Sequence, residues 1–278
     1  MPDGMGSRMT AAFFEDGPND PDPLLEDLKG MLRQHAGSFA RNNQKAMGPS
    51  EIGHPCGRNI VGRMLGFEAI NPQFDPLPAY LGTAAHKQME DAAALDNERI
   101  AKSYADPTTV RPGPMKRWLT ETKVHVRDGL SGTCDLYDTW TGTVIDYKFP
   151  GTSRMTMYRK AVAAGLPPST IYKRQCHFYG RGYQRAGYPV KRVAIWLIPR
   201  AGMLSTSVLW SEDYDDGLVD AEFERVDSLL LLADELDIDH HPERLQWVPK
   251  TPYDCNFCPM FTVRKDHPSP AACRGEES

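Results

Sequence analysis

The sequence predicts an α/β fold in which a mixed central sheet is flanked by helices. Three observations support this class. Three consecutive strand candidates are joined by short glycine turns, a helix candidate follows them, and further strands come after that helix. Strands on both sides of a helix in one chain favour a single sheet that contains parallel and antiparallel neighbours. We found no internal repeat.

Five segments are predicted as strands: residues 118–127, 130–140, 143–149, 192–199 and 204–210. The turns Asp128-Gly129 and Thr141-Gly142 join the first three into hairpins. Predicted helices cover residues 23–32, 50–65, 82–100, 169–186 and 213–236. The strands and helices therefore alternate as expected of one sheet with helical layers.

The two ends of the chain differ from the middle in composition. Residues 1–22 are rich in Gly, Pro and Asp and are predicted to form a disordered lead. Residues 23–248 are predicted to form the main domain, with a helical N-terminal flank, and residues 249–278 an irregular, Cys-rich tail. The chain has neither an apolar signal core nor a run long enough to span a membrane, so we expect a cytosolic protein.

Charge is strongly segregated along the chain, although the net charge is only −5. Residues 151–200 contain ten Lys and Arg and no Asp or Glu, whereas residues 201–246 contain thirteen acidic residues and two arginines. Local fields decide whether an anion is attracted. The acid-free segment is thus a candidate phosphate-binding surface, and the alternative is an ordinary basic face on an acidic protein.

Two carboxylates are predicted to meet on neighbouring strands. Asp135 follows Gly132, and Asp146 comes eleven residues later, two residues before Lys148. Because strand side chains alternate, Asp146 and Lys148 point to one face, and the intervening turn can bring Asp135 beside them. A divalent metal would relieve the repulsion between the carboxylates, and the lysine could position water or stabilise developing charge.

A histidine and a glutamate lie one helical turn apart in an Ala-rich segment. His86 and Glu90 therefore share a face, and they could complete a metal site with Asp135 and Asp146. Taken alone, His86 would be better explained as a surface or structural histidine.

A second pair at helical spacing, Gln175 and Tyr179, follows the hairpins. Three arginines surround this pair, at positions 174, 181 and 185. The lack of acidic residues favours a helix that tracks phosphates, and the alternative is a helix with an ordinary polar face.

Four short motifs now stand in a fixed order: Gly82-Thr83-Ala84-Ala85-His86, Gly132-x-x-Asp135, Asp146-Tyr147-Lys148 and Gln175-x-x-x-Tyr179. Their order and spacing, over roughly residues 80–200, resemble the RecB-like nucleases of the PD-(D/E)xK superfamily, and the combination is far more specific than any one motif. The resemblance implies a restriction-endonuclease-like core.

The resemblance also implies a role for each motif. The ligands of Mg²⁺ or Mn²⁺ would be His86, Asp135, Asp146 and the backbone carbonyl of Tyr147. Lys148 would be catalytic. The helix of Gln175 and Tyr179, with Arg174, Arg181 and Arg185, would bind DNA beside the metal.

The cysteines fall into two groups. Cys255-x-x-Cys258 lies in the Pro-rich tail and Cys56 lies about thirty residues before the nuclease motifs. This arrangement is similar to the iron–sulfur subgroup, the AddB nuclease subunit and the CRISPR-associated adaptation nucleases. The resemblance implies a [4Fe–4S] cluster that clips the two ends of the chain together, with Cys273 as the fourth ligand.

Two alternatives remain open for this cysteine site. Fourteen residues separate Cys258 from Cys273, more than is usual in the family, so His267 could replace Cys273. Zinc would also suit thiolate ligands. Cys134 and Cys176 fall in a predicted strand and a predicted helix, where we expect buried apolar fillers.

These observations predict a metal-dependent exonuclease that hydrolyses single-stranded DNA or duplex ends, in recombination, repair or phage-type DNA processing. The alternatives are a non-catalytic DNA-binding accessory protein of recombination and a metal hydrolase of small phosphoesters. Any helicase or recombination protein would be a separate partner.

Overall fold

The structure, a computed structural model, describes residues 23–38, 47–71, 75–264 and 266–275. The chain divides into two compact units, one that ends at Asn43 and one that runs from Gln44 to Ser278. The predicted lead, residues 1–22, lies outside the described residues. The described helix of the first unit is α1 (Pro23–Gly37), which continues beyond the predicted end at Leu32.

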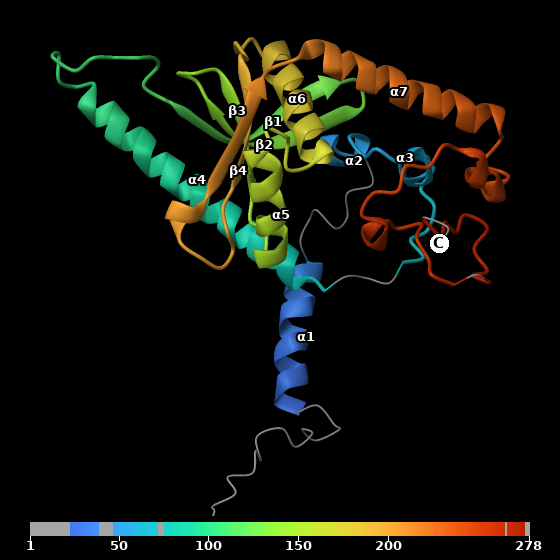
Figure 1. The fold of residues 1–278 in the computed structure, drawn as a ribbon. Helices are drawn as coiled ribbons and strands as arrows, with labels where there is room; N and C mark the ends of the chain where they lie inside the picture. Colours follow the sequence, from blue (N-terminus) through green and yellow to red (C-terminus); the bar gives the residue numbers. More distant parts are fainter. Residues whose placement is uncertain (1–22, 39–46, 72–74, 265, 276–278) are drawn as a thin grey trace, which may run out of the picture. The chain divides into compact units, whose positions relative to one another are not determined.

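The second unit is built on one five-stranded sheet with the strand order β1-β2-β3-β4-β5 (Figure 1). Its strands are β1 (Trp118–Arg127), β2 (Leu130–Asp138), β3 (Thr143–Lys148), β4 (Arg192–Leu197) and β5 (Val208–Asp213). The β3–β4 pair is parallel and the other three pairs are antiparallel, so the predicted mixed sheet is confirmed.

The two predicted hairpin turns depend on glycine. Gly129 and Gly142 have φ angles of +76° and +69°, a region that favours residues without a Cβ atom. A Cβ atom on Gly142 would also lie only 2.7 Å from the carbonyl oxygen of Pro189. These turns hold β1, β2 and β3 in sequence order at one side of the sheet.

The described helices of this unit are α2 (Pro49–Ile52), α3 (Gly57–Met64), α4 (Leu77–Ser103), α5 (Thr152–Ala163), α6 (Thr170–Arg185) and α7 (Asp216–Glu235). Short 3-10 helices occur at Leu204–Thr206, Pro242–Trp247 and Cys255–Phe257. No described helix is both long and apolar enough to cross a membrane.

Four element predictions need correction. The helix expected over 50–65 is two helices, because Pro55 disfavours helical geometry at the residue before it. The helix expected from Gly82 begins at Leu77, since a proline is tolerated in a first turn. The strand expected over 204–210 begins at Val208, after a 3-10 turn. Helix α5 was missed.

Helices cover both faces of the sheet (Figure 1). On one face, α5 and α6 pack on the strands through a buried cluster that includes Val144, Cys176 and Ile195. On the other face, Ala93 of α4 packs against Leu136 and Tyr147. The residues of β3 alternate between these two clusters, as strand geometry requires.

A separate buried cluster joins the C-terminal tail to the rest of this unit. Ile60 and Val61 of α3 and Val226 of α7 pack with Met260 and Ala271 of the tail. Helix α3 and the tail are almost 200 residues apart in sequence, so this apolar cluster places the N-terminal and C-terminal cysteines in one region.

Candidate metal site and cysteine pocket

Asp135 and Asp146 lie where strands β2 and β3 separate. The β2–β3 ladder consists of three pairs and ends at Leu136–Ile145. Asp135 and Asp146 therefore lie one residue beyond this last pair, each on its own strand. Past that point, the backbone N–H of Tyr147 donates a hydrogen bond of 2.7 Å to Oδ2 of Asp135. The Asp135 carboxylate thus satisfies a strand N–H that the ladder no longer reaches.

Asp146 is fully buried, and its carboxylate has an ion contact but no well-formed hydrogen bond. Nζ of Lys148 lies 2.5 Å from Oδ2, which confirms that the two side chains share a face. Neither carboxylate oxygen has a hydrogen bond of normal geometry, so the contact is a charge pair that lacks the directional bonds a buried carboxylate needs. Burial raises the pKa of Asp146, and the negative charge of Asp135 raises it further.

Lys148 is held as a cation on this face. Burial alone would lower the pKa of its ammonium, but Asp146 and Asp135 outweigh that effect and raise it above the ordinary value. The ammonium also lies 4.6 Å from the ring centre of Tyr172 on α6. A lysine fixed in this way can donate hydrogen bonds to an oxygen that gains negative charge.

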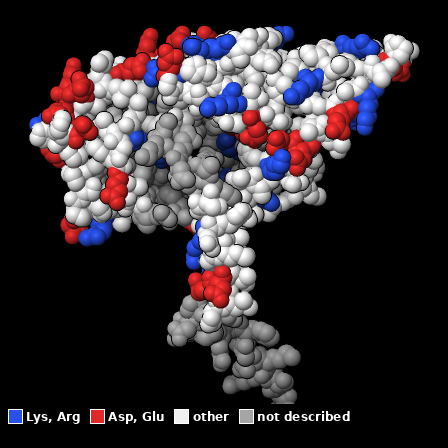
Figure 2. Space-filling view, turned by 180° about the vertical axis from the view of Figure 1, so that it is seen from behind, with Lys and Arg blue, Asp and Glu red and all other residues white. Residues whose placement is uncertain are grey.

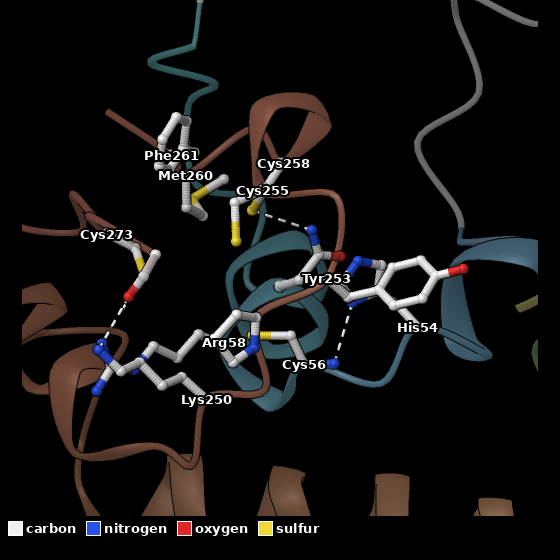
Figure 3. Close-up of a pocket in the computed structure, with 13 residues that line it drawn as sticks. His54, Cys56, Arg58, Lys250, Tyr253, Cys255, Cys258, Met260, Phe261 and Cys273 are labelled. Carbon is white, nitrogen blue, oxygen red and sulfur yellow. Dashed lines mark hydrogen bonds between the residues drawn. The ribbon is translucent and has the colours of Figure 1, made fainter. Parts of the chain in front are cut away.

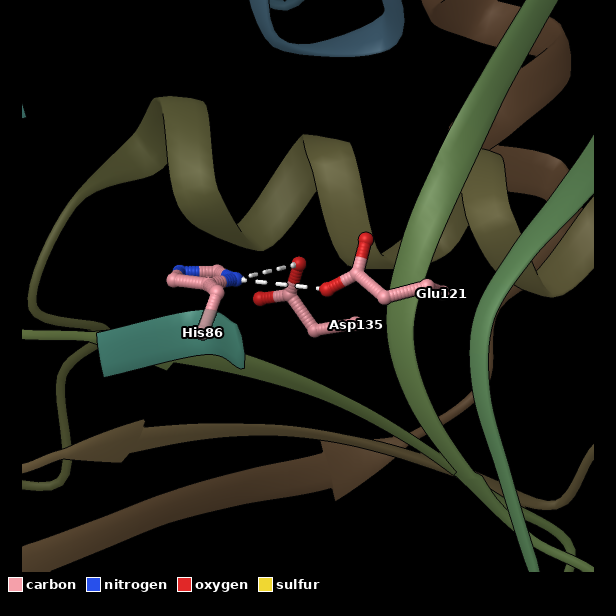
Figure 4. Close-up of side chains that lie close together, drawn as sticks. All are labelled: His86, Glu121 and Asp135. Atoms are coloured by element: carbon pink, nitrogen blue, oxygen red, sulfur yellow. Dashed lines mark ion pairs between the residues drawn. The ribbon is translucent and has the colours of Figure 1, made fainter. Parts of the chain in front are cut away.

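His86 of α4 points toward Glu121 of β1 and Asp135 of β2 (Figure 4). Its Nδ1 atom lies 3.4 Å from Oδ1 of Asp135 and 3.6 Å from Oε1 of Glu121 on β1. Burial would lower the pKa of His86, but the nearby carboxylates of Asp135 and Glu121 prevail and raise it to about 9. Among the described residues, these three form the group of potential ligands whose atoms all lie within 4.8 Å.

Glu90, which the sequence suggested as a ligand, is not part of this group. Its carboxylate accepts a hydrogen bond of 2.9 Å from Lys87. Glu121 takes its place near His86, and the sequence analysis missed it. A register shift between His125 and Arg127 brings Glu121, rather than Thr122, opposite Asp135, so counting back from the turn at Asp128-Gly129 would have missed it.

Helix α6 brings Gln175 and Tyr179 to the same region, but both are buried. The Gln175 amide donates a hydrogen bond of 3.0 Å to the Tyr179 hydroxyl. A Cβ atom on Gly132 would approach the Tyr179 ring to 2.8 Å and a carbon of Pro49 to 2.7 Å. The glycine of the Gly-x-x-Asp motif is therefore required for close packing of α6 and α2 on β2.

The predicted basic surface on α6 is largely neutralised. Nε of Arg174 lies 2.6 Å from Glu222, and Arg181 pairs with Asp216 at 2.5 Å and Asp220 at 2.8 Å. All three acids belong to α7, so the charges that are segregated in sequence meet in space. Of the three arginines predicted to track phosphates, Arg185 remains exposed. The face shown in Figure 2 likewise mixes basic and acidic side chains.

The four cysteines predicted as cluster ligands line one pocket (Figure 3). Cys56 caps the N-terminus of α3, Cys255 and Cys258 flank the 3-10 helix of the tail, and Cys273 forms an isolated parallel bridge with Phe261. All six cysteines of the chain are free thiols. His267 lines a different cavity, so the geometry gathers Cys273 rather than His267.

Hydrogen-bond donors and positive charges surround the thiols of this cysteine pocket. The Asn59 amide donates to Sγ of Cys258 at 3.1 Å, and Arg58 lies 3.8 Å from Sγ of Cys273. Lys250 also lines the pocket. Burial raises the pKa of Cys258, although the Asn59 bond opposes that effect. Such an environment suits sulfur ligands that carry negative charge.

The remaining two cysteines are fully buried. Cys134 and Cys176 are 0% exposed and belong to the apolar cluster beneath α6. Burial raises the pKa of both thiols well above the ordinary value. They pack as apolar side chains, in agreement with the sequence analysis.

No family model and no curated protein matches this chain. Among solved structures it is similar to an alkaline exonuclease, LHK-Exo, from Laribacter hongkongensis, with 12% identity and a TM-score of 0.36 over 71% of this chain and 95% of that one. The complex of LHK-Exo with dAMP matches at 12% identity and a TM-score of 0.35 (72% and 96%). The protein SSO0001 matches at 13% identity and a TM-score of 0.43 (86% and 95%).

Proposed function

We propose that this chain is a nuclease that requires a divalent metal ion and hydrolyses phosphodiester bonds of DNA. The observation that carries the proposal is Asp146, which is fully buried: its Oδ2 contacts Lys148, and its Oδ1 has no hydrogen-bond partner. A buried, under-bonded carboxylate is costly unless something compensates its charge. A cation shared with Asp135 and His86 would provide that compensation.

The donor set fits Mg²⁺ or Mn²⁺. Carboxylate oxygens suit both ions, and one imidazole is more typical of a site that also accepts Mn²⁺. The residues that would hold the ion are His86, Asp135, Asp146 and the carbonyl of Tyr147, and the last of these comes from the family resemblance alone. When bound, the ion would activate water and neutralise charge on the phosphate.

The protein groups would then divide the remaining tasks. Asp135 is oriented by the Tyr147 N–H, so its free oxygen Oδ1 faces His86. Lys148 donates protons in hydrogen bonds toward the developing negative charge, since Asp146 keeps its ammonium charged. DNA, single-stranded or at duplex ends, would approach along the exposed side of Glu121 and His86.

We also propose that the cysteine pocket holds a [4Fe–4S] cluster. Four thiols line one pocket beside Arg58 and the Asn59 amide, and such thiols could hold either an iron–sulfur cluster or a zinc ion. The resemblance to the iron–sulfur nucleases favours the cluster.

The test of the nuclease proposal is incubation of the protein with end-labelled single- and double-stranded DNA in Mg²⁺, Mn²⁺ or EDTA. We expect cleavage with either metal, none with EDTA, and none with the Asp146→Asn variant. Retained DNA binding without cleavage in any metal would instead support a non-catalytic accessory protein.

A further inference from the structure

The carboxylate of Glu121 lies at the metal site, although the motifs that define the proposed nuclease do not include it. Glu121 sits in the middle of β1, between the register pairs Thr120–Leu136 and Thr122–Cys134. It therefore faces Asp135 across the hairpin, but the two residues do not form a ladder pair themselves. Two like charges placed opposite each other destabilise a hairpin unless another charge compensates them.

The backbone at Glu121 is also unfavourable. Its φ angle is +44°, and of the three described non-glycine residues with positive φ it is the one within a strand. Glutamate has no special tolerance for this region, unlike Asn or Asp. The Thr122 hydroxyl donates to the carbonyl of Thr120 at 3.3 Å and so bridges the distortion. The local structure thus maintains a bend that turns the Glu121 side chain toward His86.

A second observation at the same site is an under-bonded buried carboxylate. Asp146 is 0% exposed, its Oδ2 contacts Lys148, and its Oδ1 has no hydrogen-bond partner. The His86 imidazole contacts both Asp135 and Glu121. The described residues thus gather three carboxylates and an imidazole, a ligand set of the kind that binds a divalent cation.

We propose that Glu121 is a further ligand of the divalent cation, supplying a third carboxylate oxygen beside Asp135 and His86. The proposal rests on the nuclease function proposed above. It explains why a repelling side chain and an unfavourable backbone are kept together, since both are relieved when a cation joins Oε1 of Glu121 to Oδ1 of Asp135. Strained backbone commonly occurs at functional sites for this reason.

A purely positioning role for Glu121 makes a different prediction. If the side chain only held the His86 ring, an amide oxygen would serve equally well, because it also accepts a hydrogen bond. Glu121→Gln keeps that acceptor and removes the negative charge. Glu90→Gln makes the same change on α4, one turn from His86, where the carboxylate binds Lys87 instead.

The experiment is a titration of full-length protein with Mn²⁺, with free Mn²⁺ measured by electron paramagnetic resonance in the absence of DNA. Four proteins are compared: the parent, Glu121→Gln, Glu90→Gln and Asp146→Asn. We expect Glu121→Gln to weaken Mn²⁺ binding by about tenfold or more, and Glu90→Gln to match the parent.

The outcomes separate this inference from the proposed function. Parental affinity in Glu121→Gln, together with lost binding in Asp146→Asn, would overturn the role of Glu121 and leave the nuclease proposal intact. Parental affinity in Asp146→Asn would overturn the metal site itself. If Glu121→Gln does not fold, as judged by circular dichroism, Glu121→Gly gives the same reading, because glycine suits the positive φ.

Discussion

The candidate metal site and the cysteine pocket each contain one histidine. The pKa values of these two histidines are shifted in opposite directions. The carboxylates of Asp135 and Glu121 raise the pKa of His86 to about 9 despite its burial. Burial and the nearby Arg63 lower the pKa of His54 to about 4. The first region is negative and suited to a cation, and the second is surrounded by cations and suited to anionic sulfur ligands.

The two regions also differ in how the chain builds them. Asp135, Asp146 and Lys148 come from adjacent strands within fourteen residues of sequence. The cysteine pocket joins Cys56 to residues almost 200 positions later, through apolar contacts of α3 with the tail. We therefore expect changes in the metal site to affect chemistry first, and changes in the cysteine pocket to affect stability first.

The largest expected effect is on catalysis. Asp146→Asn or Lys148→Ala should lower the rate of DNA cleavage by about 10³-fold or more, because each removes a charge that acts on the reacting phosphate. Asp146→Asn should unfold at a temperature close to that of the parent, whereas Lys148→Ala should also lose stability because it leaves the buried Asp146 carboxylate without its partner. Rates are measured on end-labelled DNA with Mg²⁺ or Mn²⁺, and Glu90→Gln is the control. A parental rate in either variant would show that the catalytic site lies elsewhere.

The next effect is on stability. Cys56→Ser, Cys255→Ser, Cys258→Ser and Cys273→Ser should each lower the free energy of unfolding by about 3 kcal/mol, as for other cross-links that close long loops. Each should also bleach the absorbance at about 400 nm of protein purified without oxygen. Cys176→Ser is the matched control, since that thiol lies outside the pocket, and it should keep the colour. Colourless protein with stoichiometric zinc would contradict the cluster.

The pH dependence of stability should distinguish the two histidines. The folded pKa of His54 lies below its unfolded value of about 6.5, so its contribution is full above pH 6.5 and is lost as the pH falls toward 4. The folded pKa of His86 lies above its unfolded value, so its contribution is full below pH 6.5 and is lost as the pH rises through 9. Each contribution is on the order of 1–3 kcal/mol.

Urea unfolding of metal-free protein between about pH 3.5 and about pH 10, a range that spans both transitions, measures these contributions. His54→Gln should flatten the acid side of the profile and His86→Gln the alkaline side. Identical pH profiles of stability for the two variants would contradict the opposite pKa shifts of His54 and His86.

The smallest effect concerns the arginines outside both regions. Arg181→Gln removes a partly exposed ion pair between α6 and α7, so it should cost only about 0.5–1 kcal/mol of stability. It should leave the salt dependence of DNA binding unchanged. Arg185→Gln should reduce the log–log slope of that dependence by about 0.7–0.9 if this exposed side chain contacts a phosphate. Equal salt-dependence slopes in the two variants would show that this part of α6 does not contact DNA.

The sequence by itself determined the sheet and the placement of three catalytic candidates. Strand alternation and two glycine turns put Asp146 and Lys148 on one face next to Asp135, because these are local properties of strands and hairpins. The resemblance to the iron–sulfur nucleases, rather than any local property, implied the four thiols that line the pocket. For the strands, the signal lay in residue type and short-range spacing.

Only the tertiary structure decided the rest. It placed Glu121, and not Glu90, beside His86, because that placement depends on a distorted φ angle and on how α4 meets β1. It also paired Arg174 and Arg181 with acids of α7, so a charge run in sequence did not become a basic surface. Charge compensation acts through space between helices that pack together, and the order of residues along the chain does not encode which helices those are.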